Sequence, residues 1–276
     1  MPALQQYFSD FPAALRYWRG KRGYSQLQLS TIGAVSQRHL SFLESGRSQP
    51  SKEIILKLGQ VLDIPLRQRN VMLLAAGFAP AYQERALADP ELQPVRQALD
   101  FMLAQQAPYP ALVVDRLWHL QMSNTGAANL LGWLLDLPHG QPLPANGAVS
   151  VPRLLLDPAG LRPFIVNWRE VATDMLAWIQ REAMSDGPGS EATVLLDELV
   201  TLYGCEGDAA VLDAERPALP FVPVHLRKDG VELKLFTTIA TMGTPRDVTL
   251  HELRIESFFP ADAATAAWFT ARAAPA

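Results

Sequence analysis

The chain has 276 residues, of which 49% are hydrophobic, and its mean hydropathy is close to zero, as in an ordinary globular protein. No apolar run approaches the roughly 18 residues of a membrane-spanning helix. The first residues lack the basic start and apolar core of a signal peptide, so we expect a cytoplasmic protein without a membrane partner. The single cysteine, Cys205, excludes an intramolecular disulfide and a cysteine-based zinc site.

The net charge of −4 is distributed unevenly along the chain. Residues 1–80 carry a net charge of +6, whereas the remainder carries −10. A basic region joined to an acidic one favours a polyanion as the partner of the first region only. The alternative is a chance clustering of basic residues on the surface.

Residues 1–78 are predicted to form an all-α domain of five short helices. The helices are expected at about residues 10–22, 25–32, 36–45, 51–64 and 66–76. Ser25 and Gln28 have the spacing of a capping box, in which each side chain satisfies a free N–H group of the other residue. Ser36 caps the third helix, whose Leu40 and Leu43 are expected to face the core.

The second and third helices are separated only by a turn at residues 33–35, which predicts a helix-turn-helix. The third helix has a polar outer edge that no other helix is predicted to cover. Glutamine and arginine make paired hydrogen bonds to adenine and guanine edges in the major groove, and the start of the second helix suits a phosphate. We predict a DNA-binding face made of Gln26, Gln28, Ser36, Gln37, Arg38, Ser41, Phe42, Arg47 and Lys52. A helical module that binds another protein is the alternative.

These segments resemble the Xre-type, lambda-repressor-like helix-turn-helix family. The similarity includes Ser25-Gln26 and the run from Leu43 to Arg47, LESGR, followed by Pro50-Ser51. The resemblance implies that double-stranded operator DNA is the partner. It also implies a buried ion pair between Arg19 and Glu44 that ties the first helix to the third.

One position departs from that family's pattern. The family usually has glycine immediately before the position of Val35, whereas this chain has Ala34 there and Gly33 one residue earlier. A left-handed alanine costs about 1–2 kcal/mol. We therefore expect an altered turn between the second and third helices.

Residues 79–108 are predicted to be a proline-marked connector with one helix, at about residues 92–105. Its apolar stripe is formed by Val95, Leu99 and Met102. The connector leads into a C-terminal domain of residues 109–276.

The C-terminal domain is predicted to begin with two short strands, at residues 111–115 and 117–122. Asn124 then caps a helix that reaches about residue 135, and two more helices are expected at residues 163–183 and 190–202. The helix at 163–183 carries a long apolar stripe with Trp178 beside it.

The end of the chain returns to strands. Asp229-Gly230 predicts a two-residue hairpin turn that pairs Leu226 with Leu233 and Arg227 with Glu232. A last strand is expected at residues 248–259. Its apolar residues lie at even positions in the first half, Val248 and Leu250, and at odd positions in the second half, Leu253 and Ile255. We therefore expect a bulge near His251-Glu252.

This order of strands, helices and strands predicts an α+β chain in which the N-terminal helix-turn-helix is followed by a PAS-like domain, an antiparallel sheet covered by helices. The space between sheet and helices is a place where such a fold holds a ligand. Trp168 and Trp178, on a helix that covers the sheet, either line this space or belong to the core, whereas Trp133 and Trp268 are interpreted as core residues.

Three segments of this domain resemble the MmyB-like ligand-binding domain of Xre-type regulators: PYPALVVDRLWHL with Asn124, GLRPFIVNW, and LKLFTTIATMGTPRDVTLHELRIESFFPAD. The resemblance implies a bacterial one-component transcription regulator whose PAS-like domain binds a small apolar molecule, such as a fatty-acyl compound. Arg162 suits a carboxylate, and a surface ion pair is its alternative role. The candidate ligand residues are Trp118, Arg162, Phe164, Asn167, Trp168, Val171, Met175, Trp178 and Phe236.

No pattern of catalytic residues is apparent. His251 lacks the second histidine of a metalloprotease helix, and no G-x-S-x-G motif is present. We therefore predict a regulator rather than an enzyme, with no metal and no resident cofactor. It is expected to be a homodimer, because one short recognition helix contacts too few base pairs for selectivity. The rival is a DNA-binding adaptor whose acidic domain only dimerises or docks a protein.

Overall fold

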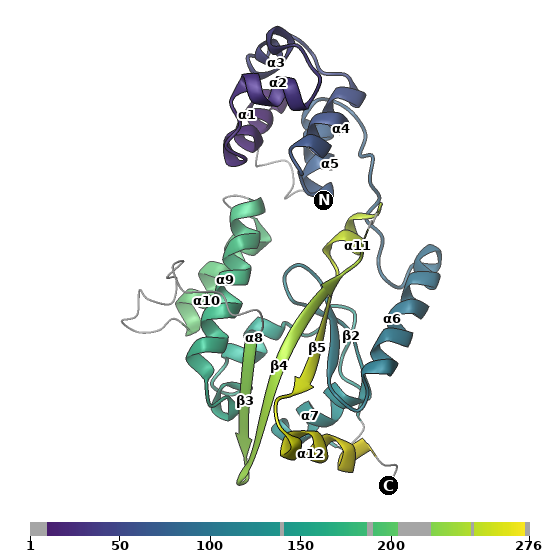
Figure 1. Cartoon of the computed structure of the whole chain (residues 1–276), viewed down its shortest axis with the longest axis vertical. Helices are drawn as coiled ribbons and strands as arrows, with labels where there is room; N and C mark the ends of the chain where they lie inside the picture. The colour runs from purple at the N-terminus through teal and green to yellow at the C-terminus, as the bar shows by residue number, and fades with distance from the viewer. Residues whose placement is uncertain (1–9, 139–140, 187–189, 204–221, 244–245, 274–276) are drawn as a thin grey trace. The chain divides into compact units, whose positions relative to one another are not determined.

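The computed structural model describes residues 10–138, 141–186, 190–203, 222–243 and 246–273. The chain divides into two compact units (Figure 1). Unit 1 comprises residues 1–84 together with 244–251, and unit 2 comprises residues 85–243 together with 252–276. The fold class is α+β, as predicted.

Unit 1 contains the five predicted helices. They are α1 (Phe11–Lys21), α2 (Gln26–Ile32), α3 (Gln37–Glu44), α4 (Lys52–Val61) and α5 (Leu66–Ala75). Four of them begin at an N-cap residue whose side-chain oxygen accepts a backbone N–H from the first turn of the helix. The N-cap residues are Asp10, Ser25, Ser36 and Ser51. Trp18, Leu29, Leu40, Leu43 and Ile55 are almost fully buried and form one core, so the third helix packs inward through the predicted leucines.

The turn between α2 and α3 keeps a left-handed residue even without glycine. Ala34 has a φ of 43°, and the Lys57 ammonium donates to its carbonyl oxygen at 3.3 Å. Val35 continues the turn by donating its N–H to the Ser30 oxygen. The expected alteration of the turn is therefore wrong, and Ala34 instead takes the strained conformation.

A segment from the far end of the chain also belongs to unit 1. Gln83 and Asp247 form a parallel β-bridge, and the N–H of Val248 donates to the Gln83 oxygen at 2.8 Å. The predicted domain boundaries did not assign residues 244–251 to the N-terminal domain, because pairing between residues so far apart in the sequence leaves no local pattern.

Unit 2 contains a five-stranded antiparallel sheet with the order β2-β1-β5-β4-β3. The strands are β1 (Ala111–Val114), β2 (Leu120–Ser123), β3 (Val222–Lys228), β4 (Val231–Thr241) and β5 (Arg254–Pro260). The β3–β4 hairpin turns at Asp229-Gly230 with the predicted pairs, Leu226 with Leu233 and Arg227 with Glu232.

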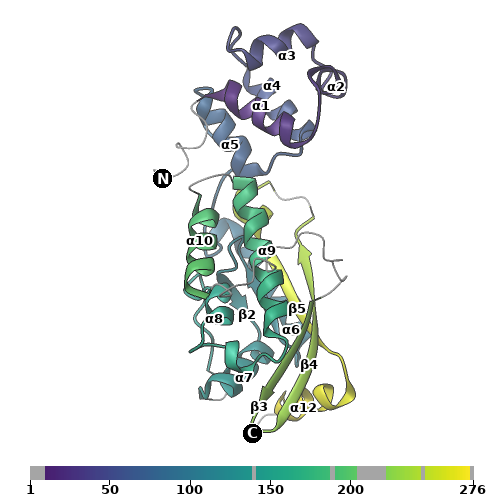
Figure 2. The same cartoon turned by 90° about the vertical axis from the view of Figure 1, so that its left-hand side faces the viewer.

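Helices cover both faces of this sheet. In chain order the helices of unit 2 are the 3-10 turn η2 (Pro90–Leu92), α6 (Gln93–Gln106), α7 (Thr125–Leu135), α8 (Val151–Leu156), the 3-10 turn η3 (Arg162–Phe164), α9 (Trp168–Asp186), α10 (Glu191–Tyr203) and α12 (Ala263–Ala273). The short helix α11 (Val248–Glu252) lies almost wholly in the segment that belongs to unit 1. α9 and α10 pack along each other, and α6 lies on the other side of the sheet (Figures 1 and 2). Leu99 and Leu103 of α6 are buried, whereas Met102, predicted to face inward, is 43% exposed.

The last predicted strand is wrong in its first half. Residues 248–252 form the short helix α11, because the Asp247 carboxylate accepts the N–H of Thr249 and Leu250 and caps it. Strand β5 begins only at Arg254, so a helical turn accounts for the change of apolar phase that suggested a bulge. The long helix also begins later than predicted, at Trp168, after the separate turn η3 at Arg162.

Candidate DNA-binding face and ligand cavity

The outer face of α3 is polar and exposed. Gln37 and Arg38 are exposed and Ser41 is half-buried, while Leu40, Leu43 and Glu44 on the same helix are buried. The helix presents its amide and guanidinium groups outward because the three buried positions fix its rotation. This is the arrangement that major-groove recognition requires.

Beneath that face lies a buried ion pair. The Arg19 guanidinium contacts the Glu44 carboxylate through two hydrogen bonds, of 2.5 and 3.0 Å, and Glu44 is only 3% exposed. Arg16 also donates to the Glu44 backbone oxygen. The pair links α1 to α3, in the geometry that the family resemblance implied.

Two residues predicted to contact DNA are held by other groups. The Gln26 amide donates to the Glu44 carboxylate at 2.7 Å, which holds the start of α2 against α3. The Gln28 side chain accepts the N–H of Ser25 and completes the capping box of α2. Gln28 is nevertheless exposed on its outer side.

The remaining predicted DNA residues surround the start and end of α3. Ser36 is the exposed N-cap of the helix and accepts the N–H of His39. The Arg38 guanidinium lies 5.3 Å from the centre of the half-buried Phe42 ring, a cation–π contact along the helix face. Arg47 and Lys52 are exposed beyond its C-terminal end, where phosphates are the available partners.

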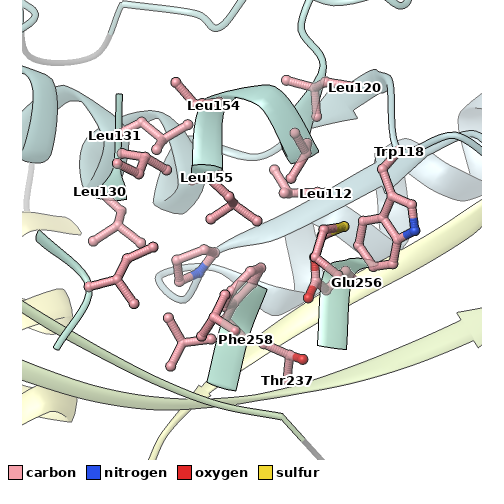
Figure 3. Close-up of a pocket in the computed structure, with 18 of the residues that line it drawn as sticks. Leu112, Trp118, Leu120, Leu130, Leu131, Leu154, Leu155, Thr237, Glu256 and Phe258 are labelled. Carbon is pink, nitrogen blue, oxygen red and sulfur yellow. The ribbon is translucent and has the colours of Figure 1, made fainter. Parts of the chain in front are cut away.

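Unit 2 contains a cavity of about 120 Å³ between the sheet and its helices (Figure 3). Two rows of side chains across neighbouring strands form its floor. One row comprises Leu112 of β1, Glu256 of β5 and Ile239 of β4, which are paired in register. The next row contains Phe258 of β5 and Thr237 of β4.

Helices α7, α8 and α9 form the roof of the cavity. α9 contributes positions spaced as one helical stripe, namely Val171, Asp174, Met175 and Trp178. α7 and α8 add mainly leucines, among them Leu130, Leu131, Leu154 and Leu155. Nearly the whole lining is therefore apolar, which favours an apolar ligand.

Trp118 enters the cavity from a strained turn between β1 and β2. Its φ is 62°, a left-handed value that is unusual for a bulky residue and costs roughly 1–3 kcal/mol. The Asp115 carboxylate accepts the N–H groups of Leu117 and His119 and so fixes the turn. Trp118 packs edge to face with Trp178 at 5.9 Å. Strain of this kind is typical of binding sites.

The cavity contains two carboxyl groups. Glu256 is 9% exposed, and burial raises the pKa of its carboxyl to about 7, although a hydrogen bond with Thr237 opposes that shift. Asp174 of α9 lines the cavity at a half-buried position. The sequence analysis predicted neither residue, since a single acidic residue in a strand, such as Glu256, or in a helix, such as Asp174, is normally assigned to a solvated face.

Four of the nine predicted ligand residues line the cavity: Trp118, Val171, Met175 and Trp178. Phe236 does not line it, because side chains alternate along β4 and those of Leu235 and Thr237 take the inner face. Phe236 stacks on Phe259 instead, at 5.3 Å.

The other four predicted ligand residues also lie outside the cavity lining. Arg162 stacks on the Trp168 ring at 3.9 Å, and Trp168 packs where two apolar clusters of the core meet. Phe164 packs under the Lys228 ammonium. Asn167 donates to the Pro223 oxygen and accepts the N–H of His225, so it ties the start of α9 to strand β3. Their segment therefore holds α9 in place.

Among the described residues, no helix combines the length and the apolar character that crossing a membrane requires. The same residues contain no group of three or more histidine, cysteine, aspartate or glutamate side chains that could hold a metal ion.

Comparison with known families identifies both domains. A helix-turn-helix model matches residues 15–68, and the model described as MmyB-like transcription regulator ligand binding domain matches residues 95–271. No curated protein matches the sequence. The fold and the sites thus define a DNA-binding transcription regulator with a ligand-sensing domain. The chain belongs to the family of MmyB-like transcription regulators, which confirms both resemblances.

Proposed function

We propose that the protein is a one-component regulator in which a small apolar ligand, bound in the cavity of unit 2, changes the affinity of unit 1 for operator DNA. The observation that carries the proposal is the nearly apolar lining of the cavity, enclosed by strands of the sheet and three helices. A ligand acts on DNA binding only if it prefers one of two arrangements of the protein.

The volume of the cavity limits the ligand. An apolar cavity of about 150 Å³ in another protein holds benzene, and the present cavity is somewhat smaller, at about 120 Å³. A short acyl chain or a single ring matches this space. A long fatty-acyl chain would require the lining side chains to move.

We further propose that the protein acts as a homodimer on a pseudo-palindromic operator. The exposed part of α3 spans only a few residues, so one copy contacts too few base pairs for selective binding. Two copies would place their recognition helices about 34 Å apart, or a multiple of that distance. A footprint confined to a single half-site would contradict this arrangement.

The rival function is an adaptor whose unit 2 only dimerises or docks another protein. The two functions differ in what native mass spectrometry detects on the protein purified from its own host. A sensor retains a small molecule, and the Ala127→Leu variant, which fills part of the cavity, should lose it. A wild-type protein that carries no small molecule would favour the adaptor.

A further inference from the structure

Glu256 is an acidic side chain at the centre of an apolar binding site. Its neighbours in the same row of the sheet are Leu112 and Ile239, and Figure 3 shows its carboxyl among the side chains of Leu112, Phe258 and Trp118. The hydrogen bond to the Thr237 hydroxyl is neutral and leaves the charge of an ionised carboxylate uncompensated.

No basic side chain is present among the described residues that line the cavity. The nearest arginine on the same face of β5 is Arg254, two residues away. Its guanidinium bonds the Glu182 carboxylate of α9 and lies 5.5 Å from the centre of the Trp178 ring. Arg254 is therefore already paired, and the second titratable group in the lining, Asp174, is another acid.

We propose that the cavity selects a small apolar amine, whose ammonium group binds the Glu256 carboxylate while its hydrocarbon part fills the space under α7, α8 and α9. This inference rests on the proposed function and adds the chemical class of the ligand. A charge-assisted hydrogen bond in a site shielded from water is stronger than a neutral one. The Thr237 hydroxyl then orients the carboxylate through a hydrogen bond, and the ammonium group of the ligand neutralises its charge.

The same geometry disfavours a free carboxylate inside the cavity. Such a group would lie near Glu256 and Asp174 without a basic partner, and like charges at short distance repel in a medium of low polarity. An alcohol is tolerated, because it donates one hydrogen bond, but it does not neutralise Glu256. The order of affinity is therefore amine, then alcohol, then carboxylate.

The test is calorimetric titration of the full chain, at about pH 8, with hexylamine, hexanol and hexanoate. We expect hexylamine to bind on the order of 10- to 100-fold tighter than hexanol, and hexanoate to bind weakest. In Glu256→Gln, which keeps the size of the side chain, hexylamine and hexanol should bind with nearly equal affinity.

Two further variants keep the interpretation specific. Glu232→Gln makes the same chemical change on β4 at a half-exposed position paired with Arg227, and it should keep the wild-type preference. Asp174→Asn should also keep most of it, because the half-buried Asp174 is better solvated than Glu256. If Asp174→Asn rather than Glu256→Gln removed the preference, Glu256 would not be the amine-binding group.

The remaining outcomes separate this inference from the proposed function. If hexanol or hexanoate bound as tightly as hexylamine, the proposal that the cavity selects an amine would be wrong. The proposal that the protein senses a small apolar ligand would still hold. Binding of none of the three compounds would contradict the amine and would also remove the support for a ligand cavity of this size.

Discussion

Each unit of the molecule contains a buried glutamate, and the two have opposite surroundings. Glu44 in unit 1 receives two hydrogen bonds from Arg19 and one from Gln26. Glu256 in unit 2 has leucine, isoleucine and phenylalanine around it and one threonine hydroxyl. Glu44 is thus fully compensated within the chain, whereas Glu256 is not.

The difference separates a structural role from a binding role. A paired and hydrogen-bonded charge holds two helices in one arrangement, and here it fixes the rotation of the recognition helix α3. An uncompensated carboxyl in an apolar cavity lowers the stability of the empty protein, and a partner that comes from outside removes that cost. Removal of the charge partner at the first site should therefore lower the free energy of unfolding, whereas removal of the carboxyl at the second site should raise it.

The largest expected effect is at the compensated site. Arg19→Ala leaves the Glu44 carboxylate, at 3% exposure, without its cation. Removal of one partner of a buried pair costs about 3–5 kcal/mol. Hydrogen exchange of the α1 and α3 amides in the full chain should report a loss of this size. Arg38→Ala, at an exposed position on the same domain, serves as the control and should change exchange little.

The second effect has the opposite sign and depends on pH. The Glu256 carboxyl has a pKa of about 7 in the folded chain against an ordinary value of 4.5. Between these values the folded state binds more protons than the unfolded state, so the free energy of unfolding falls as pH rises from about 4.5 to 7. Glu256→Gln should stabilise the protein by up to roughly 3 kcal/mol near pH 8 and by almost nothing below about pH 4.5.

Urea denaturation followed by tryptophan fluorescence can measure this difference, because five of the six tryptophans lie within residues 109–276. A gain in stability that is the same at all pH values would mean that the pKa of Glu256 is the same in the folded and the unfolded chain. If the Glu256→Gln variant were less stable than the wild type at high pH, the carboxyl would not be uncompensated in the folded protein.

The third effect concerns the exposed face of unit 1. Arg38→Ala should reduce the preference for one base pair by roughly 1–3 kcal/mol, whereas Lys52→Ala should weaken all DNA sequences alike and lower the salt slope by about one. Competition binding to a set of single-base operator variants, at several salt concentrations, distinguishes the two. Equal weakening on every sequence by Arg38→Ala would assign Arg38 to the phosphates.

The smallest effect is at the turn of the helix-turn-helix. Ala34 has a φ of 43°, and Ala34→Gly relieves about 1–2 kcal/mol of strain while adding about 0.5–1 kcal/mol of conformational entropy to the unfolded chain. A net stabilisation of roughly 0.5–1 kcal/mol should appear in the hydrogen exchange of α2 and α3. Destabilisation by glycine would show that the Ala34 methyl group makes a favourable contact in this turn.

Local patterns predicted much of the fold. The caps at Ser25, Ser36 and Asn124 and the turn at Asp229-Gly230 act over a few residues, and each was found where the sequence indicated it. Residues 248–252 were assigned to a strand because Val248 and Leu250 alternate, although Asp247 ahead of them is a helix cap. The cap was the available signal, and the alternation of apolar residues outweighed it.

The ligand site was less predictable, because a cavity depends on which faces of distant segments meet. The stripe on α9 correctly placed Val171 and Met175 in the lining. Glu256 became visible only through its register with Leu112 and Ile239, which lie far away in the sequence. Asn167 and Arg162 were chosen for their chemistry, yet their partners are a neighbouring strand and a tryptophan ring.

Control of DNA binding in unit 1 by ligand binding in unit 2 is tested most directly by operator titrations with and without ligand. Operator sites are first selected from random duplexes with the full-length protein, and the probe is whichever of hexylamine, hexanol and hexanoate binds tightest. The saturated wild type should show a Kd for DNA changed by about 5- to 150-fold. Ala127→Leu, whose cavity is partly filled, should show no change and should match the ligand-free wild type. A wild-type Kd that is the same with and without saturating ligand would contradict the coupling.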